Sequence, residues 1–256
     1  MTESTILITG ATGGIGRSLV ARCAAPSTSD GGGAESVTLL LVARQTAALT
    51  ALADSIPGAH FVAADLTTEE GAAALAETLA TLPPLHAFAH CVGSLSLKPL
   101  HRLTLAEWRE QLASHLDSAF LVLRTVVASL LERGGSVAGV LCSSVAAQVG
   151  LPNHEAVAAG KAGVEGLLRA AATSYADRGL RLNAIAPSLT ETPMTAGFLR
   201  SPAAREALAA QHPLGRIGTP DDQAAAIHWL MSADSAWISG QVLSVDGGLG
   251  LLRPRR

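Results

Sequence analysis

Seven short apolar runs alternate along the chain with longer runs rich in alanine and leucine. The short runs place apolar residues one after another, without the polar alternation of a half-exposed strand, and this is typical of strands buried on both faces. Strands joined by helices lie parallel in one sheet, and their crossovers are right-handed. The pattern therefore predicts an α/β fold in which helices cover both faces of a doubly wound parallel sheet.

The alternation also predicts where each element lies. We expect strands at residues 5–9, 37–42, 60–63, 87–90, 137–142, 181–185 and 242–245. We expect helices at residues 14–24, 47–55, 68–82, 104–133, 152–178, 203–210 and 220–231. No linker or internal repeat divides the chain, so residues 1–256 are expected to form one Rossmann-type domain of about seven strands, with residues 26–33 as a glycine-rich surface loop.

Composition excludes several classes of protein. Hydrophobic residues make up 48% of the chain and charged residues 15%, with a net charge of −3, so neither nucleic acid nor an anionic membrane is an expected partner. The three cysteines form no CxxC pair, the N-terminus has no signal-peptide pattern, and the apolar stretches are too short to span a bilayer. No histidine spacing indicates a metal site. We expect a soluble, cytoplasmic protein.

Three glycines, Gly10, Gly14 and Gly16, follow the first predicted strand and open the first predicted helix. In that context glycine lets the backbone approach a pyrophosphate, and the helix N-terminus offers free N–H groups. The second predicted strand ends in Ala43-Arg44, where an acid would bind the ribose hydroxyls of NAD. Arg44 can instead pair with a 2′-phosphate, so we predict NADP(H) over NAD(H). An arginine that only caps the strand is the alternative.

The glycine segment, Ser143-Ser144, Gly150 and the run from Val157 to Lys161 together resemble the short-chain dehydrogenase/reductase family, and ketoacyl reductases within it. The resemblance covers nearly the whole chain. It implies a nicotinamide-dependent exchange of hydride between alcohol and ketone. It also implies cofactor contacts from Gly10, Thr12, Gly14, Ile15, Gly16, Arg44, Asp65, Leu66, Gly93, Lys161, Pro187, Ser188, Thr190 and Thr192. For Asp65, a capping role before Thr67 is an equally simple interpretation.

The same resemblance identifies a change in the catalytic residues. In the family a tyrosine gives the proton, a lysine four residues later lowers its pKa, a serine positions the carbonyl, and an asparagine holds a relay water. Ser144 and Lys161 match the serine and the lysine, whereas Val157 replaces the tyrosine and His115 stands at the asparagine position. Valine neither donates nor accepts a proton. General acid catalysis contributes about 10² to 10⁴ in rate, so we expect this chemistry to be lost or weak.

Three functions remain open at this point. The chain is a weakly catalytic or non-catalytic NADP(H)-binding subunit, an active NADPH-dependent ketone reductase, or a protein that senses cofactor state. An active enzyme would need His154, His115, Lys161 or water as the proton donor. The family resemblance implies a dimer or tetramer, either of this chain alone or mixed with an active relative. It also implies a substrate lid near residues 190–213, whose Met194, Phe198, Leu199 and Leu208 suit an apolar or acyl substrate.

Overall fold

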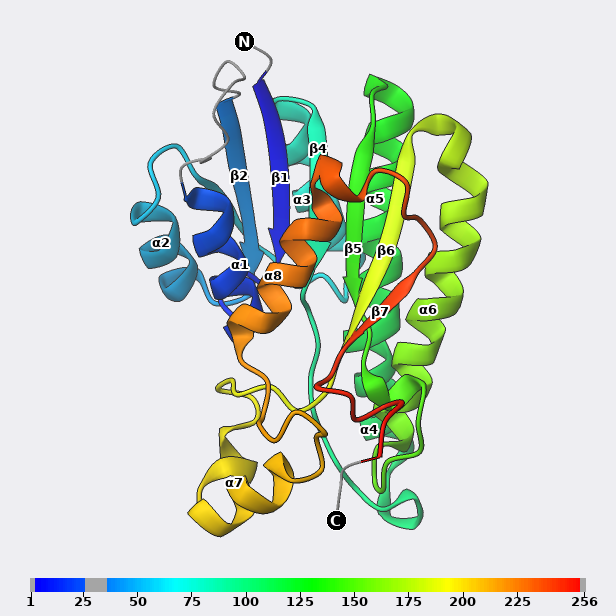
Figure 1. Ribbon diagram of the computed structural model, residues 1–256. Helices are drawn as coiled ribbons and strands as arrows, with labels where there is room; N and C mark the ends of the chain where they lie inside the picture. The colour runs from blue at the N-terminus through cyan, green and yellow to red at the C-terminus, as the bar shows by residue number, and fades with distance from the viewer. Residues whose placement is uncertain (1–2, 26–35, 254–256) are drawn as a thin grey trace.

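The computed structural model describes residues 3–25 and 36–253 (Figure 1). The predicted loop at residues 26–33 lies outside them. Seven strands form one parallel sheet in the order β3-β2-β1-β4-β5-β6-β7, which confirms the predicted fold class. The strands are β1 (Glu3–Thr9), β2 (Ser36–Ala43), β3 (His60–Ala63), β4 (Leu85–His90), β5 (Val137–Cys142), β6 (Leu180–Pro187) and β7 (Val242–Val245).

Two layers of helices cover the sheet. One layer holds α1 (Gly14–Ala24), α2 (Thr46–Asp54) and α8 (Pro220–Met231), whose buried side chains join one apolar core. The opposite layer holds α3 (Glu69–Thr81), α4 (Leu105–Leu112), α5 (Ser118–Arg133) and α6 (Glu155–Tyr175), and α3, α5 and α6 enclose a second core around Phe88. The central strands β4, β5 and β6 are buried almost throughout because each face lies under helices, whereas the edge strands β3 and β7 are largely exposed or half-buried.

All carboxyl ends of the strands meet at one edge of the sheet, the lower edge in Figure 1. There the chain crosses β1 to α1 and β5 to α6, and the short helix α7 (Pro202–Ala209) lies beyond this edge. In open parallel sheets, ligands bind at this edge near the point where the strand order reverses. Here the order reverses between β1 and β4, and this places any site beside the glycine turn.

The helix predicted at residues 104–133 is interrupted by a π-helical turn at Ala113–Asp117, which joins α4 to α5. The joined run Leu105–Arg133 is 29 residues long and apolar enough, by length and composition, to span a membrane. The prediction that every apolar stretch is too short was therefore wrong on length. Over half of its apolar window, 56%, is buried inside the fold, and this is the pattern of a core helix.

Helix α6 begins at Glu155, three residues after the predicted start. The residue ahead of its cap, Asn153, has φ 63°, so the chain turns sharply before the helix can form. His154 occupies the cap position without making a side-chain cap hydrogen bond. Because α6 begins directly after this turn, Val157 and Lys161 lie one helical turn apart in its first two turns, near the carboxyl edge of the sheet.

Candidate functional site

The turn after β1 is fixed by backbone contacts. Gly10 has φ 69°, and a Cβ there would lie 2.7 Å from the carbonyl oxygen of Cys91. A Cβ at Gly16 would lie 2.2 Å from the carbonyl oxygen of Gly10. Helix α1 starts at Gly14, and its cap residue makes no side-chain hydrogen bond, so the first helical N–H groups are free of a side-chain cap. The turn has the geometry that a bound phosphate needs.

A cavity of about 470 Å³ opens beside this turn, between the ends of β1, β2, β3 and β4. Of the predicted cofactor residues, its wall brings together Gly10, Thr12, Arg44, Asp65, Leu66 and Gly93. Gly14 instead packs against Thr192, since a Cβ at Gly14 would lie 2.7 Å from that side chain. Met194, predicted to face the substrate, lines this cavity as well.

Asp65 is held by its local turn. Its Oδ1 accepts hydrogen bonds from the Thr67 backbone N–H at 3.0 Å and from the Thr67 hydroxyl at 2.8 Å. These bonds, first of all the backbone one, lower the pKa of Asp65, and the positive charge of Arg44 lowers it further. The cap of α3 is Thr68, whose hydroxyl accepts from the Gly71 N–H, so Asp65 closes the turn ahead of the helix and is not its cap. The charged group that faces the cavity from the end of β2 is the exposed Arg44.

Lys161 and His115 meet under the cavity floor at Gly93. A Cβ at Gly93 would lie 3.5 Å from both the His115 ring and the Nζ atom of Lys161. The Lys161 amine donates a 2.7 Å hydrogen bond to the carbonyl oxygen of Cys142, and burial lowers its pKa. His115 is 1% exposed, and neither ring nitrogen has a hydrogen-bond partner among the described residues.

The electrostatics keep His115 uncharged. Burial, and then the neighbouring Lys161 and His90, lower the pKa of His115 to about 3. His115 lies in the π-helical turn, and π-helical turns often occur at functional positions. Both ring nitrogens can form hydrogen bonds next to Lys161. Leaving them unpaired in a buried position costs free energy, which favours a hydrogen-bonding ligand there. Sequence reasoning found the residue but had no signal for the π turn.

His90, at the end of β4, links three elements through its ring. Its Nδ1 lies 2.8 Å from the Thr9 hydroxyl and its Nε2 lies 3.1 Å from the Ser118 hydroxyl. Ser118 donates to the carbonyl of Ser114 at 2.7 Å, so its oxygen accepts from His90 Nε2–H. The imidazole thus ties β1, β4 and α5 together.

A second cavity, of about 260 Å³, lies between the start of α6 and the segment around α7. Val157 is 5% exposed and forms part of its wall, together with Ser144 and His154. The remaining wall is mostly apolar and includes Leu95, Leu97, Phe198 and Leu208. The predicted lid residues Phe198 and Leu208 therefore border this cavity, and the Val157 side chain offers no polar atom to a ligand in it.

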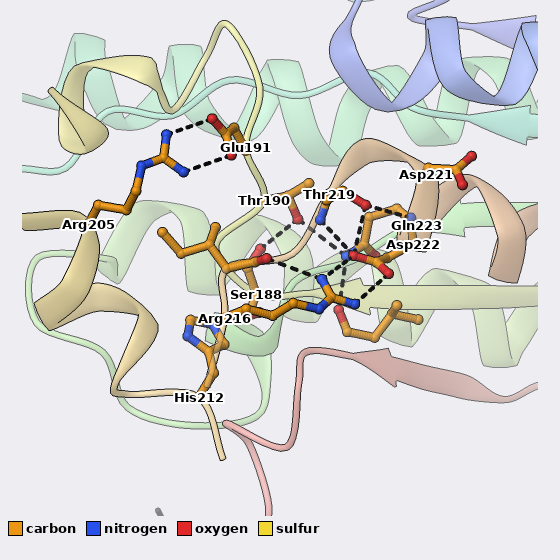
Figure 2. Close-up of polar contacts among 12 residues, drawn as sticks. Ser188, Thr190, Glu191, Arg205, His212, Arg216, Thr219, Asp221, Asp222 and Gln223 are labelled. Atoms are coloured by element: carbon orange, nitrogen blue, oxygen red, sulfur yellow. Dashed lines mark hydrogen bonds and ion pairs between the residues drawn. The ribbon is translucent and has the colours of Figure 1, made fainter. Parts of the chain in front are cut away.

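Sequence reasoning missed one polar pair in the second cavity. His212 and Ser188 both line it, and the His212 Nε2 lies 3.0 Å from the Ser188 hydroxyl. The loop that carries Ser188 is anchored to α8: Gln223 donates to the hydroxyl of Thr190 at 3.2 Å and to the carbonyl of Val245 at 3.0 Å (Figure 2). No spacing rule connects residues 188 and 212, which only the fold brings together.

Two exposed ion pairs brace the same region. Arg205 pairs with Glu191 through contacts of 2.6 and 2.8 Å, and Arg216 pairs with Asp222 through contacts of the same lengths (Figure 2). Within residues 3–25 and 36–253, no three histidine, cysteine, aspartate or glutamate side chains gather as a metal site would require. Besides hydroxyls and imidazoles, the polar groups at this edge are the buried amine of Lys161 and the charged side chains of Arg44 and Asp65 in the wall of the larger cavity.

Comparisons with known proteins match the chain along almost all of its length. A family profile described as enoyl-(acyl carrier protein) reductase matches residues 10–250. The chain is 35% identical over 253 residues to cis-4-hydroxycyclohexanecarboxylate dehydrogenase of Sinomonas cyclohexanicum, with 96% of each chain covered. It is 34% identical to inactive 2-(S)-hydroxypropyl-CoM dehydrogenase 2 of Xanthobacter autotrophicus, over 73% of this chain and 84% of that one.

Solved structures agree with the sequence matches. A crystal structure of an oxidoreductase of the short-chain dehydrogenase/reductase family from Burkholderia thailandensis has a TM-score of 0.84 to this chain. The two are 33% identical, and the match covers 99% of this chain and 95% of that one. The match thus spans the residues of the glycine turn, of both cavity walls and of the segment around α7.

Proposed function

Because this chain belongs to the short-chain dehydrogenase/reductase family, we propose that it binds NADP(H) and that its tyrosine-dependent hydride chemistry is lost or weak. Members of this family bind a nicotinamide cofactor. The observation that carries the proposal is Val157, a buried hydrocarbon in the wall of the 260 Å³ cavity at the family's tyrosine position. In the cytoplasm the protein would act as a weakly catalytic or non-catalytic subunit of an oligomer.

The turn and the larger cavity fit a dinucleotide. Gly10 and Gly16 allow a close backbone packing of the turn that any Cβ would break, and the start of α1 offers N–H groups to a pyrophosphate. In this proposal Thr12, Gly14 and Ile15 also contact the pyrophosphate, Asp65 and Leu66 the adenine, and Gly93 and Lys161 the nicotinamide ribose. The segment of Pro187, Ser188, Thr190 and Thr192 covers the nicotinamide, which when bound supplies or accepts a hydride.

The preference for the phosphorylated cofactor rests on the end of β2. Ala43 carries no acid there, and Arg44 is exposed in the cavity wall. A guanidinium pairs with a phosphate through two parallel hydrogen bonds, whereas a ribose hydroxyl would prefer a carboxylate. Arg44 thus supports NADP(H) over NAD(H).

The residues at the family's proton-transfer positions support slow turnover. Ser144 and Lys161 remain, but the Lys161 amine bonds to a backbone carbonyl and has no tyrosine to act on. Losing a general acid costs about 10² to 10⁴ in rate, which corresponds to roughly 3 to 5 kcal/mol of barrier. Orientation of a substrate against the cofactor would survive, and orientation alone is a large contribution to catalysis.

A second candidate is an active NADPH-dependent ketone reductase with a different proton donor, and one observation favours it. His154 lines the same cavity as Val157, and its Nδ1 lies 2.8 Å from the carbonyl of Pro152, which leaves Nε2 for a ligand. His115 and Lys161 do not line that cavity. His115 is also uncharged near neutral pH, since its pKa is about 3, and this disfavours it as an acid.

Exposed apolar side chains support assembly. Phe120 and Leu131 on α5 are 47% and 51% exposed, and Trp237 before β7 is fully exposed. We propose that α5 and the β7 edge form the contacts of a dimer or tetramer. The assembly contains either copies of this chain alone or this chain together with an active relative. Light scattering after size exclusion tests the first form, and co-purification with an intact relative tests the second. A monomer under both conditions would contradict the proposal.

The function is tested by cofactor binding and turnover measured on the same protein. We expect NADPH fluorescence to titrate saturably and more tightly than NADH. Oxidation of NADPH by a panel of small cyclic ketones should be at least about 10²-fold slower than with an intact relative. Absence of NADPH binding would contradict the proposal as a whole. Binding with fast turnover would favour the second candidate, and His154→Ala would then show whether His154 is the acid.

A further inference from the structure

The pair formed by Ser188 and His212 is part-buried and defined in its hydrogen bonding. His212 is 3% exposed, and its Nδ1 lies 2.9 Å from the carbonyl oxygen of Leu208. A carbonyl only accepts hydrogen bonds, so the proton of the neutral ring is on Nδ1. The lone pair of Nε2 then accepts from the Ser188 hydroxyl, 3.0 Å away. A serine hydroxyl bonded to a fixed imidazole is an arrangement able to exchange a proton.

The pair faces the cavity that Val157 borders. Ser188 and His212 line the 260 Å³ cavity together with Val157 and Ser144. Ser188 directly follows β6, and His212 lies shortly after α7. Thr190 donates to the carbonyl of Ser188 at 3.1 Å, and this hydrogen bond holds the loop that presents the hydroxyl. The cavity therefore combines a hydrocarbon at the family's tyrosine position with a hydroxyl–imidazole pair on another wall.

We propose that Ser188 and His212 exchange the proton of a small uncharged secondary alcohol or ketone bound in this cavity. The inference rests on the proposed function, because it assumes that the nicotinamide end of the cofactor reaches the same cavity. Ser188 contacts the substrate oxygen, and His212 is a positioning and relay residue behind it.

The proposed step balances in both directions. In oxidation, the alcohol proton passes to the Ser188 oxygen while the serine proton passes to His212 Nε2. The carbon–hydrogen bond breaks, its electron pair leaves as hydride to the nicotinamide, and the carbon–oxygen double bond forms. His212 is then an imidazolium, with one N–H on the Leu208 carbonyl and the other on Ser188. Reduction reverses each transfer and returns His212 to its neutral form.

The cavity wall indicates which substrates fit. Its side chains are mostly apolar and include Leu95, Leu97, Phe198 and Leu208, and among the described residues that line it there is no lysine or arginine. A carboxylate buried there would have no cationic partner, and burying an unpaired charge is costly. We therefore expect cyclohexanol and cyclohexanone to bind better than their carboxylated analogues.

The first test uses nuclear magnetic resonance of ¹⁵N-labelled histidine, which needs no turnover. We expect one imidazole, assigned by its loss in His212→Gln, to be in the Nδ1–H form. Its signal should shift saturably on addition of cyclohexanol to the NADP⁺-saturated protein, and should not shift in Ser188→Ala. His101→Gln, at an exposed position, serves as the control. An Nε2–H ring, or no shift in the wild type, would overturn the proposal.

The second test separates binding from proton exchange by kinetics of cyclohexanol oxidation. His212→Gln still offers an oxygen to Ser188 but cannot relay a proton, so kcat should fall about 10²-fold with KM little changed. Ser188→Ala should lower kcat and raise KM, and Ser188→Thr, which keeps the hydroxyl, should restore both. Unchanged kcat in His212→Gln would reject the relay. If NADP⁺ does not bind, the proposed function fails, whereas the alcohol-dependent shift in the cofactor-free protein still decides whether the pair contacts the ligand.

Discussion

The glycine turn and the wall around Val157 lie at the same edge of the sheet, yet different parts of the chain fix them. In the turn, a Cβ at Gly16 would lie 2.2 Å from a backbone oxygen, so the backbone itself excludes other residues. At the wall, Val157 borders an open cavity, and Lys161 bonds to a backbone carbonyl and not to the side chain of residue 157. The turn, which is the proposed binding half, therefore resists substitution, whereas the wall, which is the proposed proton-transfer half, can lose its chemistry while the fold remains.

The largest expected effect comes from breaking the turn. Gly16→Val places a branched side chain where even a Cβ approaches the Gly10 carbonyl oxygen at 2.2 Å, so the turn must open. We expect NADPH binding to be lost within the range of a fluorescence titration, together with a lower melting temperature. Gly197→Ala is the matched control, because nothing lies within 4 Å of its Cβ position. Tight NADPH binding by Gly16→Val would contradict the conclusion that the backbone of the turn excludes other residues.

The next effect tests the proposal that the wall lacks only a catalytic hydroxyl. Val157→Tyr adds a phenol that reaches into the cavity beside Ser144, one helical turn from Lys161. We expect kcat/KM for ketone reduction to rise about 10²- to 10⁴-fold, the value of a general acid, and less if Ser188 and His212 already exchange the proton. Val157→Phe adds the same ring without the hydroxyl and should give no gain. An inactive tyrosine variant that still binds NADPH would show that the wall has changed elsewhere.

The same division explains what the sequence could and could not predict. Seven strands, their parallel arrangement and the glycine turn follow from apolar periodicity and from backbone sterics, both of which are local properties. Apolar periodicity carries no signal for the π turn that holds His115 or for the positive φ of Asn153 just before α6. The contact between Ser188 and His212 joins segments 24 residues apart whose side-chain directions no periodicity determines.

Arg44 tests the specificity of the binding half. A charge-assisted hydrogen bond contributes about 1.5 to 3 kcal/mol, so Arg44→Ala should weaken NADPH about 10- to 100-fold and leave NADH unchanged. Arg178→Ala, exposed at the opposite edge of the sheet, is the control. The measurement is the ratio of the two dissociation constants for each variant. An equal loss for NADPH and NADH would mean that Arg44 only supports the end of the strand.

The smallest effect concerns the buried imidazole next to Lys161. The pKa of His115 is about 3 in the folded protein, below the value of about 6.5 for a free histidine. The unfolded chain therefore binds the extra proton, and the stability that His115 contributes is present above pH ~6.5 and is lost as the pH falls toward 3. Each such group changes the free energy of unfolding by up to about 1.4 kcal/mol per pH unit. His115→Asn should therefore flatten the pH dependence of the free energy of unfolding, measured with urea between pH 6 and 4. His101→Asn, exposed, should leave the slope unchanged. An unchanged slope in His115→Asn would mean that the ring is charged in the folded state, and His115 would then return as a possible acid on the proton-transfer side.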